Sequence, residues 1–253
     1  MTTQRTTHRW GTQPEMFGPR HEYRLAMFLR ETAKLPAGSG VLDAAMGLGQ
    51  LASRIARQGH RVVGVDASFE AALHVRRSTD VQPVLGDLTK LPFQDGVFGA
   101  VTSGETLEHL DDDRAAVSEI ARVLRNEGTA VVTVPALEML WSGSDDYYEH
   151  RRRYGRKQLT ALFAGASLTV RKARFWGFPI VLVYDTLFLL PMNRRRARRD
   201  PAADPALRSV AQAGRARWLV RAVQSVFSID RLFGFVPFGP GLLLVARKKG
   251  RDE

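Results

Sequence analysis

The sequence predicts a single α/β domain built on a doubly wound, mostly parallel sheet. The first reason is the run Val41 to Ala52, in which a short apolar strand ends at Asp43 and passes through a glycine turn into a helix. The second reason is that strand-like and helix-like segments alternate up to Pro135, as they do in parallel sheets with crossover helices. The third is that small or acidic residues follow four successive strands, at the edge where open parallel sheets bind ligands.

The predicted strand ends carry candidate ligand-binding side chains. The strand Arg61 to Val65 is followed by Asp66, and the strand Val81 to Leu85 is followed by Gly86 and Asp87. The strand Val97 to Thr102 is followed by Ser103, Gly104 and Glu105. A glycine turn lets a ligand approach the backbone closely, and a carboxylate about 20 residues further on can accept hydrogen bonds from both ribose hydroxyls. The strand ends therefore predict a site for a nucleotide-like ligand.

Helices are predicted from apolar spacing and from capping residues. The predicted helices are Glu22 to Lys34, Leu48 to Gln58, Phe69 to Ser78, Asp111 to Leu124 and Gly155 to Phe163. Ser68 is the expected N-cap of the third, with Phe69 and Leu73 on one face. In the fourth, the residues expected to face the sheet are Ala116, Ile120, Val123 and Leu124.

From Gly40 to Pro135 the motifs resemble those of class I S-adenosylmethionine-dependent methyltransferases, closest to the small-molecule, type 11-like group. VLDAAMGLG resembles the first motif, D-x-G-x-G-x-G, with Ala45 in place of the first glycine. Alanine fits there if its φ is negative, whereas a positive φ would be strained. GVDAS resembles the motif whose acid binds ribose, and the segment beginning GDLTKLPF resembles the motif that binds adenine.

This resemblance implies S-adenosylmethionine as the cofactor. It places Asp66 at the ribose and Asp87 at the adenine amino group. The full set of expected cofactor-binding residues is Asp43, Ala45, Gly47, Gly49, Asp66, Ala67, Asp87, Leu88 and Ser103. The resemblance also implies a seven-stranded Rossmann-like sheet, with a sixth strand at Leu168 to Trp176 and an antiparallel seventh at Gly241 to Arg247.

The segment after the fifth strand, Ser144 to Tyr154, is dense in titratable and aromatic side chains. His150 is the candidate general base, because an imidazole titrates near neutral pH. Asp146 or Glu149 could orient it, and the tyrosines Tyr147, Tyr148 and Tyr154 could shape the acceptor pocket, with Tyr154 also a catalytic candidate. In the alternative interpretation, His150 and its neighbouring arginines only pin the loop.

His109, in the segment LEHL after the fourth strand, is the rival catalytic candidate. The competing interpretation is that it caps the following helix, and the roles of Glu105 and Glu108 are equally open. No set of histidine and acidic residues has the spacing of a metal motif, so the sequence predicts no metal. The absence of cysteine excludes disulfides and thiol chemistry.

The chain is read as one domain over residues 1–253. An N-terminal lid helix within 15–38, to which Trp10, Phe17 and Tyr23 could add side chains, precedes a core of 40–176 and 238–248. Residues 177–237 form an insertion that is too long for a plain loop. Its apolar run from Trp176 to Met192 is too short to span a membrane. The residue pattern further on predicts an amphipathic helix from Arg215 to Phe233, with Trp218 and Leu219 on its apolar side.

The formal net charge of +11 is uneven, with basic clusters at 151–157, 194–199 and 208–221. Such a field suits an anionic membrane surface, an acidic substrate or nucleic acid, and it is equally consistent with a solvated basic surface. The insertion is accordingly either a cap over a bulky apolar acceptor, a membrane-contact element, or a helical hairpin that packs on the sheet or forms a homodimer contact. No N-terminal apolar segment suggests secretion, so a cytoplasmic location is expected, with peripheral contact at the inner membrane face as an option.

The combined expectation is methyl transfer from S-adenosylmethionine to a small-molecule or lipid-linked acceptor, at oxygen rather than nitrogen or carbon. One alternative is a scaffold or regulator that binds the cofactor without methylating. The other is a nucleic-acid methyltransferase, which is disfavoured because the fourth strand is followed by Ser103-Gly104-Glu105-Thr106 rather than the Asn/Asp-Pro-Pro-aromatic motif. The basic runs also lack the interleaved aromatics of a stacking platform.

Overall fold

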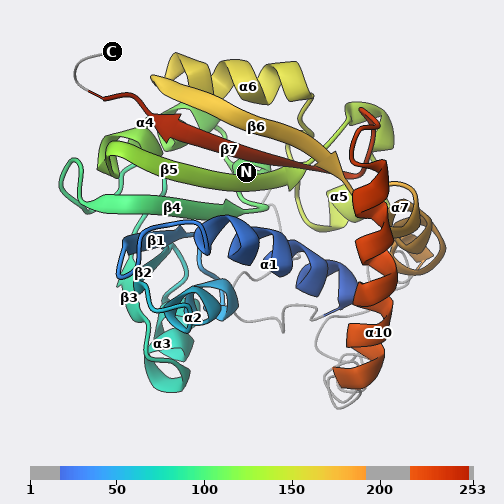
Figure 1. The fold of residues 1–253 in the computed structure, drawn as a ribbon, viewed down its shortest axis with the longest axis horizontal. Helices are drawn as coiled ribbons and strands as arrows, with labels where there is room; N and C mark the ends of the chain where they lie inside the picture. The colour runs from blue at the N-terminus through green and yellow to red at the C-terminus, as the bar shows by residue number, and fades with distance from the viewer. Residues whose placement is uncertain (1–17, 192–216, 251–253) are drawn as a thin grey trace, which may run out of the picture.

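The computed structural model describes residues 18–191 and 217–250, except for the side chains of 217–219 and 221. Trp10, Phe17, the arginines of 194–199 and the side chains of Trp218 and Leu219 therefore lie outside the described part. The strands are β1 Gly40–Ala44, β2 Arg61–Asp66, β3 Gln82–Leu85, β4 Phe98–Gly104, β5 Leu124–Pro135, β6 Leu168–Trp176 and β7 Gly241–Lys248. They form one sheet in the order β3-β2-β1-β4-β5-β7-β6 (Figure 1).

The strand directions confirm the predicted fold class. Neighbouring strands from β3 across to β5 are parallel, and β7 runs antiparallel to both of its neighbours, β5 and β6. The central strands are apolar on both faces because helices cover both faces, as parallel sheets require. The largest core cluster joins the sheet to α4 and α6, a second joins it to α1, α2 and α10, and a third, smaller one joins α2 to α3.

The helices bear out most of the predicted ones, with shifted ends. They are α1 Pro19–Thr32, α2 Gln50–Ala56, α3 Phe69–Ser78, α4 Asp113–Val123, α5 Gly143–Tyr147 and α6 Arg156–Gly165. α2 begins two residues later than expected because Gly49 adopts a left-handed conformation as its N-cap. α4 begins at Asp113 because the Asp112 side chain accepts a hydrogen bond from Ala115 N at 2.9 Å.

In α3 the expected cap is present, and the face that packs into the core is not the one that carries Phe69. Ser68 Oγ accepts a hydrogen bond from Ala71 N at 3.2 Å. Phe69, however, is 63% exposed, and the buried residues of the helix are Ala71 and Val75. Phe69 is the first residue of the helix and projects past the end of the sheet, so it contributes to the wall of the cavity described below.

The leading helix α1 packs on the sheet rather than standing apart as a lid. Tyr23 and Phe28 are buried in the core, and Glu22 accepts two hydrogen bonds from Arg54 of α2, at 2.6 and 2.7 Å. In Figure 1, α1 (blue) lies across the sheet and meets α10 at one end. Its first turns also reach the cavity, so packing and covering are combined in one helix.

The insertion forms two helical segments that are tied together. α7 Ile180–Tyr184 continues as a π-helical turn, η3 Asp185–Leu189, and the second segment is α10 Arg217–Phe227 followed by a 3₁₀ helix, η5 Ser228–Phe233. The predicted single helix from Arg215 to Phe233 is thus divided after Phe227. The buried Asp230 carboxylate accepts hydrogen bonds from Ile180 N and Val181 N, at 2.8 and 3.0 Å. Among the described residues, no helix is long and apolar enough to cross a membrane.

Candidate active site

A cavity of about 1120 Å³ opens at the carboxyl ends of the parallel strands. One side consists of the turns after β1, β2 and β3, which carry the predicted cofactor motifs. The other side consists of the end of β4, the segment from Pro135 to Arg153, the first turns of α1, and α7 with η3. In Figure 1 the strands β4 and β5 point toward α5, α7 and α10, which is where this second side lies.

Asp66 ties the glycine turn to the end of β2. Its Oδ2 accepts a hydrogen bond from Gly47 N and its Oδ1 accepts one from Ser68 N, both at 2.8 Å. A carboxylate held by two backbone N–H groups has a fixed orientation while keeping lone pairs for a ligand. Asp66 lines the cavity, and the other predicted residues that do so are Asp43, Ala45, Gly47, Ala67, Asp87 and Leu88.

Two predicted cofactor residues do not line the cavity. Gly49 is needed for the turn, because its φ is +73° and a Cβ there would come within 2.8 Å of Val75 Cγ2. Ser103 is buried in β4, and the cavity wall begins at the next residue, Gly104. Both residues therefore support the site without facing it.

Ala45 has a strained backbone, because its φ is positive, which is the case in which the sequence predicted strain for an alanine at this position. Its φ is +63°, in the left-handed region, where a Cβ costs roughly 1–2 kcal/mol. It is the first residue of the turn after β1, and it lines the cavity beside Gly47. The chain keeps the left-handed turn of the motif even though alanine occupies a position at which the motif has glycine.

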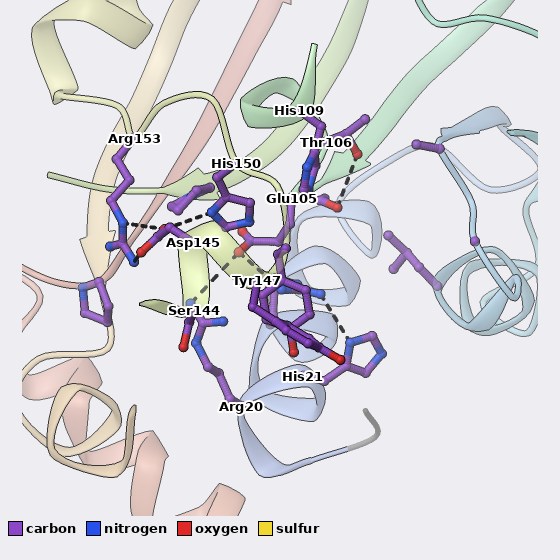
Figure 2. A pocket seen from close by; sticks show the side chains of 18 of the residues that line it. Arg20, His21, Glu105, Thr106, His109, Ser144, Asp145, Tyr147, His150 and Arg153 are labelled. Atoms are coloured by element: carbon purple, nitrogen blue, oxygen red, sulfur yellow. Dashed lines mark hydrogen bonds and ion pairs between the residues drawn. The ribbon is translucent and has the colours of Figure 1, made fainter. Parts of the chain in front are cut away.

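His150 is held by a buried carboxylate. Its Nδ1 lies 2.8 Å from Asp145 Oδ1, and Arg153 donates hydrogen bonds from Nε and Nη2 to the two oxygens of the same carboxylate, at 2.8 and 3.0 Å. Figure 2 shows Asp145 between the two side chains. Burial alone would raise the pKa of Asp145, but the hydrogen bonds from His150 and Arg153 outweigh it and hold that pKa below its usual range.

The orienting residue is therefore Asp145, and neither Asp146 nor Glu149 takes that role. Ser142 donates from its backbone N to Asp145 Oδ2 at 2.8 Å, in a capping box that turns Asp145 inward at the start of α5. Asp146, the next residue, accepts from Trp141 Nε1 at 3.0 Å. Glu149 is exposed.

The structure brings both rival histidines to one place. The rings of His109 and His150 meet edge to face with centroids 4.8 Å apart. Glu108 is fully buried beside them, with its Oε1 at 3.9 Å from His109 Nε2 and 4.0 Å from His150 Nε2. Burial, with repulsion from Glu105, raises the pKa of Glu108 well above its ordinary value. His109 does not cap α4, because Asp112 does.

Tyr154 lies away from the cavity and serves the loop instead. It is fully buried, its Oη is 2.8 Å from Asp113 Oδ2, and its backbone N donates to Pro135 O at 2.9 Å. Burial, with the neighbouring Asp113, raises the pKa of its hydroxyl. Arg151 and Arg152 likewise donate to backbone carbonyls after β4, at His109 and Leu110, so the pinning interpretation holds for them. Tyr147 and Tyr148 do line the cavity, as expected.

Several charged or titratable residues of the site were not predicted, among them four from α1 and η3. Arg20, His21 and Arg24 reach it from α1, and Asp185 reaches it from η3. Arg20 Nε lies 3.1 Å from Asp185, and Arg24 lies 3.4 Å from Glu105. Burial lowers the pKa of His21 to about 3, with help from Arg24, and it raises that of Asp185 to about 6 against the effect of Arg20.

The fold and the site define one class of protein. A sheet with this strand order and an antiparallel seventh strand, a glycine turn tied to a ribose-type acid, and a cavity at the carboxyl edge are the features of a class I methyltransferase fold. A family model described as a methyltransferase domain matches residues 42–132. Residues 42–132 therefore resemble the methyltransferase-domain family, the chain has the fold of the class I S-adenosylmethionine-dependent methyltransferases, and S-adenosylmethionine is the cofactor of those enzymes.

Curated relatives match over part of the chain. A probable S-adenosylmethionine-dependent methyltransferase of Mycolicibacterium smegmatis is 35% identical over 137 residues, which is 53% of each chain. A demethylmenaquinone methyltransferase of Mycolicibacterium vanbaalenii is 40% identical over 103 residues, or 41% of this chain and 45% of that one. The chain thus spans about half the length of the curated relatives it matches.

Solved structures match nearly the whole chain at low identity. The Haloferax volcanii complex of the Trm112 activator with a methyltransferase gives a TM-score of 0.60 at 22% identity, covering 91% of this chain and 92% of that one. The structure of the cyclase SpnF gives 0.61 at 23%, covering 91% and 82%. These likenesses show the fold alone, and the fold is shared by a protein that is named for cyclisation.

Proposed function

We propose that this protein transfers a methyl group from S-adenosylmethionine to a hydroxyl oxygen of a small, lipid-like acceptor. The observation that carries the proposal is that one cavity contains both the cofactor motif residues and the His109–His150 pair. Cofactor and acceptor groups in one enclosed space meet the main requirement of methyl transfer, which is in-line approach of the two reacting atoms.

The residues present fit the cofactor. Asp66 offers lone pairs to the ribose hydroxyls, Asp87 is available to the adenine amino group, and the left-handed turn at Ala45 and Gly47 leaves backbone exposed to a ligand. When bound, S-adenosylmethionine supplies a methyl group activated by a positively charged sulfur. The acceptor oxygen attacks the methyl carbon, the carbon–sulfur bond breaks, and its electron pair stays on sulfur.

His150 is the proposed proton acceptor for the attacking hydroxyl. With the proton on Nδ1 directed to Asp145, its Nε2 carries the lone pair that can take the hydroxyl proton. His150 and Asp145 both line the cavity. This assignment follows from the Asp145 contact, which fixes the tautomer that a base requires.

An apolar wall supports a lipid-like acceptor. Leu182, Leu189 and Leu190 line the cavity from the helical segment that begins at α7, and Met139 and Trp141 also line it. The named substrate of the demethylmenaquinone methyltransferase relative is itself an apolar quinone, which supports the same class of acceptor. Acceptance of a base from nucleic acid is disfavoured, because the motif for methylating base amino groups is missing after β4.

The cofactor assignment is tested by calorimetric titration with S-adenosylhomocysteine. Asp66→Ala should weaken binding by about 1–3 kcal/mol, because it removes acceptors for ribose hydroxyls in a partly buried site. Asp66→Asn keeps the size of the side chain, so it separates the loss of ligand contacts from an effect on folding. The matched control is Asp80→Ala, which removes an exposed carboxylate outside the cavity. Unchanged affinity in folded Asp66→Ala protein would refute the assignment.

The base assignment is tested by transfer of labelled methyl groups into a cellular lipid extract. His150→Gln should lower turnover by roughly 100-fold or more while the affinity for S-adenosylhomocysteine stays the same. His74→Gln, which changes an exposed histidine of α3, is the control. Full turnover in His150→Gln would return this residue to a structural role. Cofactor binding with no labelled product in any extract would favour a non-methylating role such as that of a cyclase or a scaffold.

A further inference from the structure

Three potential metal ligands converge beside the cavity. Glu108 and His109 follow β4, His150 follows α5, and one ligand atom from each lies within 4.8 Å of the others. The two histidines line the cavity, and Glu108 is buried behind them. Figure 2 shows the His109 and His150 side chains next to each other, with Glu105 close by.

We propose that Glu108, His109 and His150 bind one divalent metal ion, with Zn²⁺ the best match. Two imidazoles and one carboxylate are a recurrent ligand set for Zn²⁺ and for non-haem iron in sites that keep open positions. At bond lengths of about 2.0–2.1 Å, tetrahedral ligand atoms stand about 3.4 Å apart. The separations of 3.9 and 4.0 Å from Glu108 to the two imidazoles need to close by only about half an ångström.

The Glu108 carboxylate points independently to a bound cation. It has no exposed surface, and neither of its oxygens has a hydrogen-bond partner from another residue in the described part of the chain. A buried carboxylate of this kind is costly unless a cation or a hydrogen-bond donor compensates it. Arg24 pairs with Glu105 and Arg20 with Asp185, and in the described part of the chain neither arginine forms an ion pair with Glu108.

Asp145 supplies the outer contact that metal-binding histidines usually have. A ligating histidine donates its second N–H to a carboxylate or carbonyl, which fixes the ring and makes it a better ligand. His150 makes this contact to Asp145 at 2.8 Å, leaving Nε2 on the side of Glu108. Arg153 in turn holds Asp145 through two hydrogen bonds. The arrangement is that of a carboxylate–histidine–metal chain.

The proposed metal narrows the acceptor class, and this step rests on the proposed methyl transfer. Three protein ligands leave positions open toward the cavity, where an acceptor with two adjacent oxygens, such as a catechol or a vicinal diol, can coordinate. Coordination lowers the pKa of the bound hydroxyl, so its proton leaves to water and the oxygen attacks the methyl carbon. In the metal-bound protein His150 would be a ligand and the ion would activate the hydroxyl, so the metal site competes with the role of His150 as proton acceptor, and the metal titration below decides between the two roles.

Metal binding is measured first, without any activity assay. The protein is treated with a chelator and dialysed. Separate samples are then titrated by calorimetry with Zn²⁺, with Mn²⁺ and with S-adenosylhomocysteine. We expect one equivalent of Zn²⁺ to bind and to raise the melting temperature. Glu108→Gln, His109→Gln and His150→Gln should each weaken binding at least tenfold, and Asp145→Asn by about 10–100-fold. His74→Gln, on the exposed face of α3, should bind like the wild type.

The outcomes separate the metal site from the proposed function. Protein that binds S-adenosylhomocysteine but no metal ion would overturn the metal site and leave methyl transfer standing. Metal binding that persists in Glu108→Gln and His150→Gln would equally overturn it, by locating the ion elsewhere. Loss of binding in the cluster variants, with cofactor affinity retained as evidence of folding, supports the site. Failure to bind the cofactor would count against the proposed function alone.

Discussion

At the residue scale, Ala45 shows how a motif can keep its geometry after losing a glycine. Its φ of +63° is close to the φ of +52° at Gly47, so the turn after β1 keeps two left-handed residues. Met46, between them, has its backbone N bound to Val65 O at 3.0 Å, and Gly47 N is bound to Asp66. These contacts to β2 fix the turn, so the strain at Ala45 is compensated by the residues that follow it.

Ala45→Gly should therefore stabilise the fold. The substitution removes a left-handed Cβ that costs roughly 1–2 kcal/mol, while the added freedom of glycine in the unfolded chain opposes this by about 0.4–1 kcal/mol. The free energy of unfolding in urea should rise by about 0.5–1 kcal/mol. As a matched control, Ala44→Gly, in β1, should destabilise. A lower unfolding free energy for Ala45→Gly would show that the alanine methyl packs favourably in the turn.

The same scale shows which site residues a sequence can reveal. Asp66 and Asp87 were predicted because each follows an apolar strand directly, and parallel strands bring their carboxyl ends together. Asp145 was missed in favour of Asp146 because α5 is only five residues long, and a shift of one residue in its start exchanges the inward and outward carboxylates. The grouping of Glu108 with His109 and His150 was not predicted, because these residues come from two segments 41 residues apart, with no motif spacing.

At the scale of elements, the leading helix and the insertion form one unit that was predicted as two. Tyr23 of α1 meets Phe227 of α10 with ring centroids 6.2 Å apart, and Arg20 of α1 reaches Asp185 of η3 at 3.1 Å. Sequence spacing predicted both helical regions, but nothing in their periodicity shows that they pack on each other. By contrast, the bounds of β6 were predicted to the residue, because Leu168 to Trp176 resembles the sixth strand of the family.

At the scale of the whole molecule, the insertion carries an exposed apolar surface next to the cavity. It is formed by Val183, Leu187, Phe188, Val226, Ile229, Leu232 and Phe235, which are all at least 46% exposed. The stretch from α7 through η3 thus has some residues that line the cavity and other, apolar residues that are exposed. Five arginines at 194–199 lie between its two helical segments in the sequence. This combination supports contact with an anionic lipid surface.

Co-sedimentation with phosphatidylglycerol-containing vesicles tests this surface. The protein should bind at low salt and less at high salt, because exposed arginine charges are screened. Leu232→Ser combined with Phe235→Ser should lower binding by roughly tenfold or more, from the loss of apolar contact. The matched control is Val97→Ser, which is 51% exposed at the start of β4. Equal binding of both variants would refute the lipid contact, and a dimer broken only by the double variant would reassign the surface to a second copy of the chain.

The two sides of the cavity come from separate stretches of the chain, so one side can change in sequence independently of the other. The cofactor side is encoded almost wholly between Asp43 and Leu88, whereas the acceptor side comes from α1, from the segment after β5 and from an insertion placed between the last two strands. Because β6 and β7 pair along their whole length, the insertion can be exchanged for another without disturbing either strand. Replacement of this insertion, together with the residues of α1 that pack on it, would therefore change the acceptor side of the cavity while leaving the cofactor side in place.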